Sequence, residues 1–277
     1  MTARSPFASK AAPEEQAKYD LKTRLIALAA ILLFGTAGWL VSLIRKDVGI
    51  VDSMWSIMFL IAAGIYGWTV GDGPRATLVM LLVALWSLRL AAHITWRNWG
   101  EDEDYRYQNI RRNNSPNFEL KSFYIVFGLQ AALAWFISLP LLAAASGPAP
   151  IGLLDLAGVL LWIVGFVFES LGDLQLAQFK ANPDNKGKVL ETGLWRITRH
   201  PNYFGDFCVW WGFYLLALSA GGWWSIASPL LMSFLLLKVS GVAMLEKDIG
   251  ERRPAYAEYV ARTNAFFPGP RKKELST

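Results

Sequence analysis

The densest group of polar functional side chains in this chain lies at residues 193–206, between two apolar segments. Its centre reads His200-Pro201-Asn202-Tyr203-Phe204-Gly205-Asp206. Asn202 and Asp206 are four residues apart, so on a helix they share one face, which Trp210 continues. Pro201 fits the first turn of that helix, where free backbone N–H groups can bind a phosphate. An amide, a carboxylate and an aromatic ring on one face suit a planar amide or heterocycle as ligand.

Basic residues surround this stretch. They are Lys180, Lys186, Lys188, Arg196 and Arg199. Such groups bind phosphate, but they are also typical of a loop that anchors a protein to lipid head groups. The anchor interpretation explains the charge and leaves the segment from His200 to Asp206 unexplained. Taken alone, His200 is as often a capping or interface histidine, and Tyr203 is more often an interfacial aromatic residue.

Further charged residues fall within or at the ends of apolar segments. They are Asp52, Arg89, Glu169, Asp173 and Lys238. A charge at the bilayer centre costs about 2.5–3.5 kcal/mol on insertion scales, so such residues are expected to be functional. Glu169 and Asp173 share one helix face, where like charges repel unless a donor-rich ligand lies between them. Asp52 could instead stabilise a helix N-terminus, and Lys238 could extend to the membrane interface.

Several kinds of site are disfavoured. The single cysteine, Cys208, excludes an intramolecular disulfide and a cysteine-based zinc site. Two histidines, His93 and His200, are too few for a metal centre, so we expect no bound metal. No nucleophile elbow, Walker motif or GxGxxG motif is present. The net charge of +5 suits an inner-leaflet surface or an anionic ligand, and we expect no nucleic acid partner.

The elements that position these residues are apolar helices. Of the 277 residues 54% are hydrophobic and 18% are charged, against about 25% charged in soluble domains. Several apolar runs approach or exceed the roughly 18 residues that span a bilayer, and a span must satisfy its backbone hydrogen bonds internally. We therefore predict an all-α integral membrane bundle of about seven transmembrane helices. The expected spans are 21–44, 50–70, 75–96, 121–145, 151–179, 202–220 and 223–245.

We expect three regions: a disordered tail at 1–20, the transmembrane domain at 21–246 and a cytoplasmic C-terminal tail at 247–277. Residues 1–20 show no signal peptide. Lys and Arg concentrate in the loops after the first, third and fifth spans and in the C-terminal tail. The positive-inside rule then places these segments in the cytoplasm and the N-terminus outside, in a bacterial-type inner membrane. The basic residues up to Arg24 are an exception, because by the same rule they favour a cytoplasmic N-terminus.

The stretch 193–206 resembles the signature of a membrane protein family known as DUF1295, which is related to the steroid 5-alpha-reductases. The resemblance covers most of the chain, from about residue 50 to 268. Other matching segments are Val51-Asp52-Ser53-Met54-Trp55, Leu85-Trp86-Ser87-Leu88-Arg89-Leu90, Glu103-Asp104-Tyr105-Arg106-Tyr107, Asp173-Leu174-Gln175, Phe179-Lys180 and Arg253-Pro254-Ala255-Tyr256. Together these segments are specific for the family.

The resemblance to the steroid reductases implies an NADPH site in the C-terminal half. Asn202, Asp206 and Trp210 match residues beside the nicotinamide, with Asp206 in place of a glutamate. Lys180 and Lys188 stand where that family has arginines at the cofactor phosphates. The complete set of cofactor-binding residues that we expect is Arg89, Glu169, Asp173, Lys180, Lys188, Arg199, His200, Asn202, Tyr203, Asp206, Trp210 and Glu246.

The same resemblance implies an oxidoreductase of lipid metabolism that acts on a lipophilic, steroid- or isoprenoid-like enone. A hydride would pass from the nicotinamide to the β-carbon of the enone. The steroid reductases grip the ketone with a Gln-Glu pair and a tyrosine, and the corresponding regions here offer Asp52, Trp55 and Trp86. We expect Asp52 to polarise the carbonyl as a protonated donor, since burial favours the neutral carboxyl, and Trp86 to assist.

Two alternatives remain open. The shorter pattern Arg-His-Pro-x-Tyr-x-Gly is shared with membrane methyltransferases such as isoprenylcysteine carboxyl methyltransferase, which bind S-adenosylmethionine at the equivalent place. His200, Tyr203 and Glu246 would then be the cofactor contacts. The other alternative is a membrane protein without enzymatic activity that binds phospholipid head groups through its basic loops and leaves Glu169 and Asp173 without a ligand.

Overall fold

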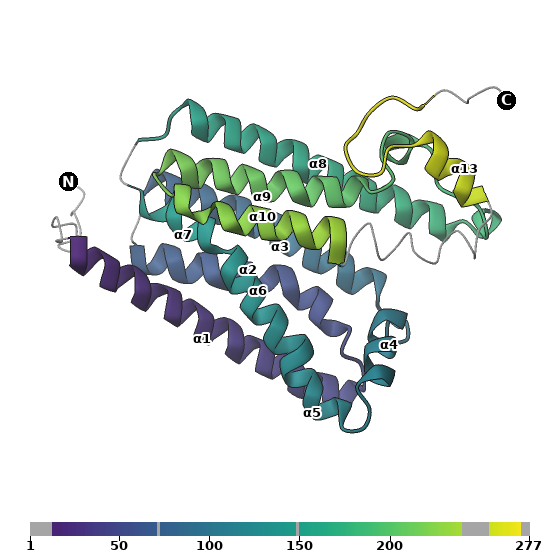
Figure 1. Ribbon diagram of the computed structural model, residues 1–277, viewed down its shortest axis with the longest axis horizontal. Coiled ribbons are helices and arrows are strands. Elements are labelled where there is room, and N and C mark those ends of the chain that lie inside the picture. The colour runs from purple at the N-terminus through teal and green to yellow at the C-terminus, as the bar shows by residue number, and fades with distance from the viewer. Residues whose placement is uncertain (1–12, 71–72, 148–149, 240–254, 273–277) are drawn as a thin grey trace. The chain divides into compact units, whose positions relative to one another are not determined.

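The computed structural model describes residues 13–70, 73–147, 150–239 and 255–272 (Figure 1). The chain forms two compact units, Met1–Ser138 and Leu139–Thr277. All regular structure within the described ranges is helical, which confirms the all-α membrane bundle. Five helices in these ranges are long and apolar enough to cross a membrane: Leu21–Arg45, Ile50–Val70, Pro74–Arg97, Phe118–Ser146 and Leu153–Ala181.

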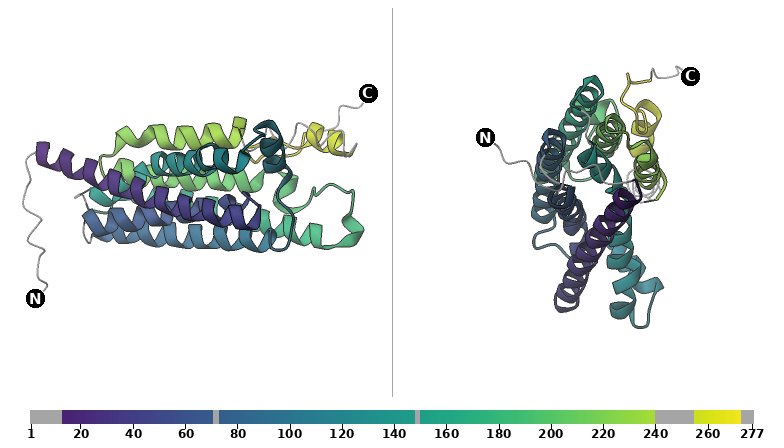
Figure 2. Two further views of the ribbon diagram at one scale, coloured as in Figure 1. Left: turned by 90° about the horizontal axis from the view of Figure 1, so that it is seen from below. Right: turned by 90° about the vertical axis from the view of Figure 1, so that its left-hand side faces the viewer.

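The N-terminal unit is built from three long helices and a fourth, irregular span. They are α1 (Pro13–Arg45), α2 (Ile50–Val70), α3 (Pro74–Arg97), and the series α5 (Phe118–Ser122), η1 (Phe123–Gly128) and α6 (Leu129–Ile137). The central helix α2 packs against α1, α3 and α6 (Figure 2). Its inner face buries large apolar side chains such as Met58 and Phe59, which accounts for its central place.

Two segments of the N-terminal unit contain more helix than the sequence predicted. The segment expected to be disordered, 1–20, is helical from Pro13 on, and residues 1–12 lie outside the described ranges. Proline is favoured in the first turn, and the Glu, Gln, Ala and Lys residues that follow it are good helix formers. The expected polar loop 97–120 contains a helix of its own, α4 (Tyr105–Asn113). The Asp104 carboxylate caps α4 by accepting a hydrogen bond of 2.9 Å from the Arg106 backbone N–H.

The C-terminal unit contains the polar stretch at residues 193–206. Its helices are α7 (Leu139–Ser146), α8 (Leu153–Ala181), α9 (Pro201–Ser219), α10 (Ala227–Phe234) and α13 (Ala255–Arg262), with short turns η2 (Pro183–Asn185), η3 (Gly193–Arg196), η4 (Trp223–Ile226) and η5 (Leu235–Val239). The expected sixth and seventh spans are helical in the described residues. They fall short of the five spans above, because α9 begins with polar residues and Trp223–Val239 is a shorter apolar helix.

Glycines bring the backbones of α8 and α9 into direct contact (Figure 1). A Cβ atom added at Gly158 would lie 2.9 Å from the carbonyl oxygen of Gly212, and one at Gly165 would lie 2.5 Å from that of Gly205. Gly172 lies against the first turn of α9, so the two helices run antiparallel. Small residues permit this close approach between membrane helices. The seven-residue spacing of these glycines is the signal in the sequence that indicates this contact.

Candidate functional site

The glycine contact places polar residues of α8 and α9 on helices whose backbones touch. Glu169 and Asp173 are buried on α8, with 3% and 7% of their surface exposed. The Asn202 amide nitrogen donates to Asp173 Oδ1 over 3.2 Å. A Cβ atom at Gly205 would lie 2.7 Å from the Cβ of Glu169, so Asp206, the next residue, follows directly on this contact. The predicted pairs Glu169/Asp173 and Asn202/Asp206 thus lie on neighbouring helices.

The N-terminus of α9 has the predicted form. His200 is the N-cap residue and Pro201 occupies the first turn. The buried His200 ring stacks on Tyr203, with 5.7 Å between ring centroids and 8° between the planes. One free backbone N–H group of the turn is already used, because Tyr203 donates to Asn202 Oδ1 over 3.1 Å, whereas the Phe204 N–H makes the ordinary first helical bond to the His200 carbonyl. The turn therefore offers an anion less than the sequence suggested.

The described C-terminal segment, residues 255–272, contacts the loop before α9 through hydrogen bonds. The Tyr259 hydroxyl donates to the Trp195 carbonyl over 2.5 Å. The Arg199 guanidinium donates to the carbonyls of Thr263, at 2.6 Å, and Val260, at 3.2 Å. Arg199 is expected at the cofactor, and these contacts show that it also fastens α13 to the loop. Because Arg199 precedes His200, the segment also fixes where α9 begins.

Glu191, in the loop between α8 and α9, makes a second connection to the C-terminal segment. The Glu191 carboxylate pairs with Arg262 over 3.2 Å and with Arg271 over 2.7 Å. The Thr198 hydroxyl donates to the Phe266 carbonyl over 2.7 Å. None of these residues was singled out from the sequence. The available signal was the charge complementarity between Glu191 and the basic tail.

A basic rim extends from the buried acids along α8. Lys180 lies seven residues beyond Asp173, which is about 10 Å along the axis and within about 20° of the direction of Glu169. Lys188 and Arg196, in the loop that follows, are exposed. One helix face therefore passes from acidic and buried to basic and exposed within about three turns.

The N-terminal unit contains the residues expected at the substrate. Asp52, at the start of α2, accepts hydrogen bonds from Arg106, at 2.8 Å, and from the Tyr107 hydroxyl, at 2.5 Å. Arg106 also pairs with Asp104 over 3.0 Å. The Asp52 side chain is 17% exposed. Tyr107, for which the sequence predicted no role, thus presents a proton to Asp52.

The remaining expected residues are distributed as follows. Trp86 is fully buried on α3, edge-on to Phe59 with 5.7 Å between ring centroids. Arg89, three residues further along α3, is partly exposed. Trp210 is fully buried on α9, packed edge-on against Phe213. Glu246 lies outside the described residues.

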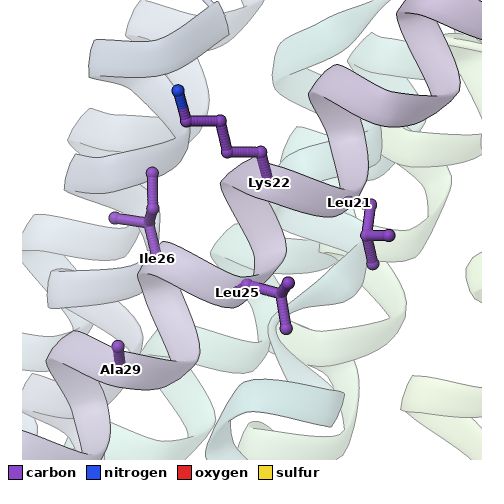
Figure 3. A pocket seen from close by; sticks show the side chains of 5 residues that line it. All are labelled: Leu21, Lys22, Leu25, Ile26 and Ala29. Atoms are coloured by element: carbon purple, nitrogen blue, oxygen red, sulfur yellow. The ribbon is translucent and has the colours of Figure 1, made fainter.

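The described ranges contain no candidate metal centre, and they contain an apolar hollow on α1. No group of three or more His, Cys, Asp or Glu residues there could hold a metal ion. A shallow hollow of about 410 Å³ lies along α1 (Figure 3), lined by Leu21, Lys22, Leu25, Ile26 and Ala29. It is almost wholly apolar on the first turns of a membrane span, where contact with lipid is expected.

The buried tyrosines predict a stability that falls at alkaline pH. Burial, and then the Asp52 charge, raise the pKa of Tyr107 well above its ordinary value of 10, and burial raises that of Tyr259. The unfolded chain therefore loses these protons at a lower pH than the folded chain, so stability is complete below pH 10 and decreases above it. We expect Tyr107→Phe to flatten the decrease in melting temperature between pH 9 and about 11. Tyr105→Phe, an exposed tyrosine of the same helix, is the control and should leave the decrease unchanged.

Comparisons with known proteins agree with the family resemblance. The sequence model of the family described as "Protein of unknown function (DUF1295)" matches residues 38–263, so the chain belongs to this family. An uncharacterised protein of Schizosaccharomyces pombe, C594.04c, is 25% identical over 90% of this chain and 81% of its own length. A probable O-methyltransferase of Ustilaginoidea virens, ustE, is 42% identical over 24% of this chain and 22% of its own length. No solved structure matches.

Proposed function

We propose that this DUF1295 protein is a membrane oxidoreductase that uses NADPH to reduce the carbon-carbon double bond of a lipophilic enone. The observation that supports this best is the change along one face of α8 from buried acidic residues to an exposed basic residue. Glu169 and Asp173 are buried beside Asn202, and Lys180 follows on the same face. NADPH has the matching polarity, because its carboxamide and ribose hydroxyls donate hydrogen bonds and its phosphates are anionic.

The chemistry of these donors and acceptors fits the cofactor. Carboxylates accept from N–H and O–H groups, and an asparagine amide pairs with a carboxamide. In this proposal Glu169, Asp173, Asn202 and Asp206 would hold the nicotinamide and ribose end. Lys180 and Lys188 would contact the phosphates. The other residues predicted to contact the cofactor are Arg89, Arg199, His200, Tyr203, Trp210 and Glu246.

NADPH would supply the hydride for the β-carbon of the enone. The part of the protein would be to polarise the carbonyl and to hold a proton near it. We propose Asp52 together with Tyr107 for this role. The Tyr107 hydroxyl donates to Asp52 over 2.5 Å and would hold the proton, and Asp52, which also accepts from Arg106, would orient this hydroxyl and exchange a proton with it. Trp86 would assist with its indole N–H. A steroid- or isoprenoid-like enone is the substrate class that we propose.

Thermal stability with added cofactor tests the proposal. Purified full-length protein should melt at a higher temperature with NADPH and show no shift with S-adenosylmethionine. Asn202→Ala and Asp206→Ala should each lower NADPH affinity by roughly 10- to 100-fold, the effect of losing a hydrogen bond to a charged or buried partner. Asn113→Ala, at an exposed asparagine of α4, should keep the full shift.

A methyltransferase is the second candidate, favoured by the segment shared with the probable O-methyltransferase. In that case S-adenosylmethionine would raise the melting temperature and NADPH would not, and His200→Ala and Tyr203→Phe would remove the effect. Shifts with neither cofactor would leave the lipid-binding alternative and would contradict both enzymatic proposals.

We further propose that the cofactor site and the C-terminus face the cytoplasm and that the N-terminus lies outside. This rests on the concentration of basic residues in the loop between α8 and α9. A cysteine introduced at the exposed Lys186 should react with an impermeant thiol reagent in inverted membrane vesicles and stay unreacted in intact cells. Labelling in intact cells would reverse the orientation.

A further inference from the structure

A second polar hollow lies in the N-terminal unit, and none of its lining residues is among those proposed for NADPH. Its volume is about 450 Å³, and it lies between the C-terminal end of α1 and the segment from α4 to α5. Its polar lining comes from Ser42, Lys46, Arg111, Glu119 and Ser122. No role in the proposed reaction involves these residues.

The charges around this hollow are mixed and nearly balanced. Arg111 donates to both oxygens of Glu103, at 3.0 and 2.9 Å, and to Glu119 at 3.3 Å. The guanidinium also lies over the Phe118 ring, 4.5 Å from its centroid. Lys46 is exposed, and its ammonium makes no ion pair among the described residues. A ligand with both a negative and a positive group therefore fits better than a simple anion.

The hollow lies at the ends of two membrane spans. One span ends at Arg45, just before Lys46, and another begins at Phe118. The apolar residues Leu43, Val48 and Phe118 line the hollow beside the polar ones. Span ends lie at the level of the lipid head groups, where basic pockets between helices bind them.

We propose that this hollow binds the head group of a zwitterionic phospholipid that has a primary ammonium, of the phosphatidylethanolamine type. Its phosphate would contact Lys46 and the outer face of Arg111. Its ammonium would donate to Glu119, whose side chain is 62% exposed and so can accept further hydrogen bonds. The start of the acyl chains would lie against Leu43 and Val48.

Native mass spectrometry of the full-length protein with defined lipids tests this site. Phosphatidylethanolamine should bind with one tight site, and more strongly than phosphatidylcholine, which has no N–H donor, or phosphatidylglycerol, which has no ammonium. Lys46→Gln should weaken this binding by roughly fivefold, the effect of one lysine near a lipid phosphate. Glu119→Gln should remove the preference for phosphatidylethanolamine over phosphatidylcholine.

The matched controls are Lys272→Gln and Glu101→Gln, which change exposed charges outside the hollow and should leave binding unaltered. Equal binding of the three lipids, or equal losses in the controls, would show ordinary annular lipid and overturn the proposal. Soluble phosphoethanolamine should bind far more weakly than the lipid. Equal affinity for it would assign the hollow to a free phosphoamine and overturn the lipid assignment.

Discussion

Replacing Gly205 with alanine should destabilise the protein by forcing the backbones of α8 and α9 apart. The new Cβ would lie 2.4 Å from the Glu169 backbone nitrogen and 2.5 Å from the Gly165 carbonyl oxygen. Neither atom can rotate away, so α8 and α9 must separate. Overpacking of this kind costs about 1–3 kcal/mol, and at about 3 kcal/mol the melting temperature would decrease by roughly 6–12 °C.

Gly64→Ala is the matched control, because a Cβ at Gly64 in α2 meets no atom within 4 Å. Alanine there should be neutral or should stabilise the helix by about 0.5–1 kcal/mol. Thermal unfolding of the two variants in the same detergent is the measurement. The Gly205 variant should also lose the NADPH shift, since Asn202 and Asp173 would move apart. Equal melting temperatures for the two variants would contradict the direct helix contact.

Asp52→Asn should lower the rate of enone reduction by roughly 10²- to 10⁴-fold, the usual contribution of a positioned acid or base. Asparagine keeps the size of the side chain and an oxygen that can accept from Tyr107, but it cannot exchange a proton. The NADPH thermal shift should persist, because the residues proposed to hold the nicotinamide belong to α8 and α9. The measurement is NADPH oxidation with a steroid enone and with an isoprenoid enone.

Asp47→Asn provides the control for this prediction. Asp47 precedes the same helix and accepts a hydrogen bond of 2.7 Å from the Gly49 N–H, which asparagine can also accept, so this substitution removes a charge and leaves the proposed chemistry intact. A full reduction rate in Asp52→Asn would remove Asp52 from the mechanism. Loss of the NADPH shift together with the rate would instead point to a structural role for its contacts with Arg106 and Tyr107.

Much of the architecture followed from the sequence, because a membrane span must satisfy two local requirements. It needs enough apolar residues to cross the bilayer and a helix to satisfy its backbone groups. The spans at 50–70 and 75–96 therefore agree closely with α2 and α3. The start of α9 was also predictable, since Pro201 favours a first turn whatever surrounds it.

Tertiary contacts decided what local pattern could not. The sequence placed Glu169 and Asp173 on one face and Asn202 and Asp206 on another, but nothing local showed that the two faces meet. The α8 and α9 glycines decide this, because only residues without a side chain allow the helix backbones to touch.

The same distinction holds for Asp52 and for the opening stretch. Asp52 was recognisable as a charge in an apolar segment, yet its partners Arg106 and Tyr107 lie more than fifty residues away and reach it only because α4 folds back. The sequence of residues 193–206 was enough to show that polar functional side chains are concentrated at the start of a helix. Only the folded chain showed that Arg199 fastens the C-terminal segment, because its partners at Val260 and Thr263 are backbone carbonyls that no side-chain pattern reveals.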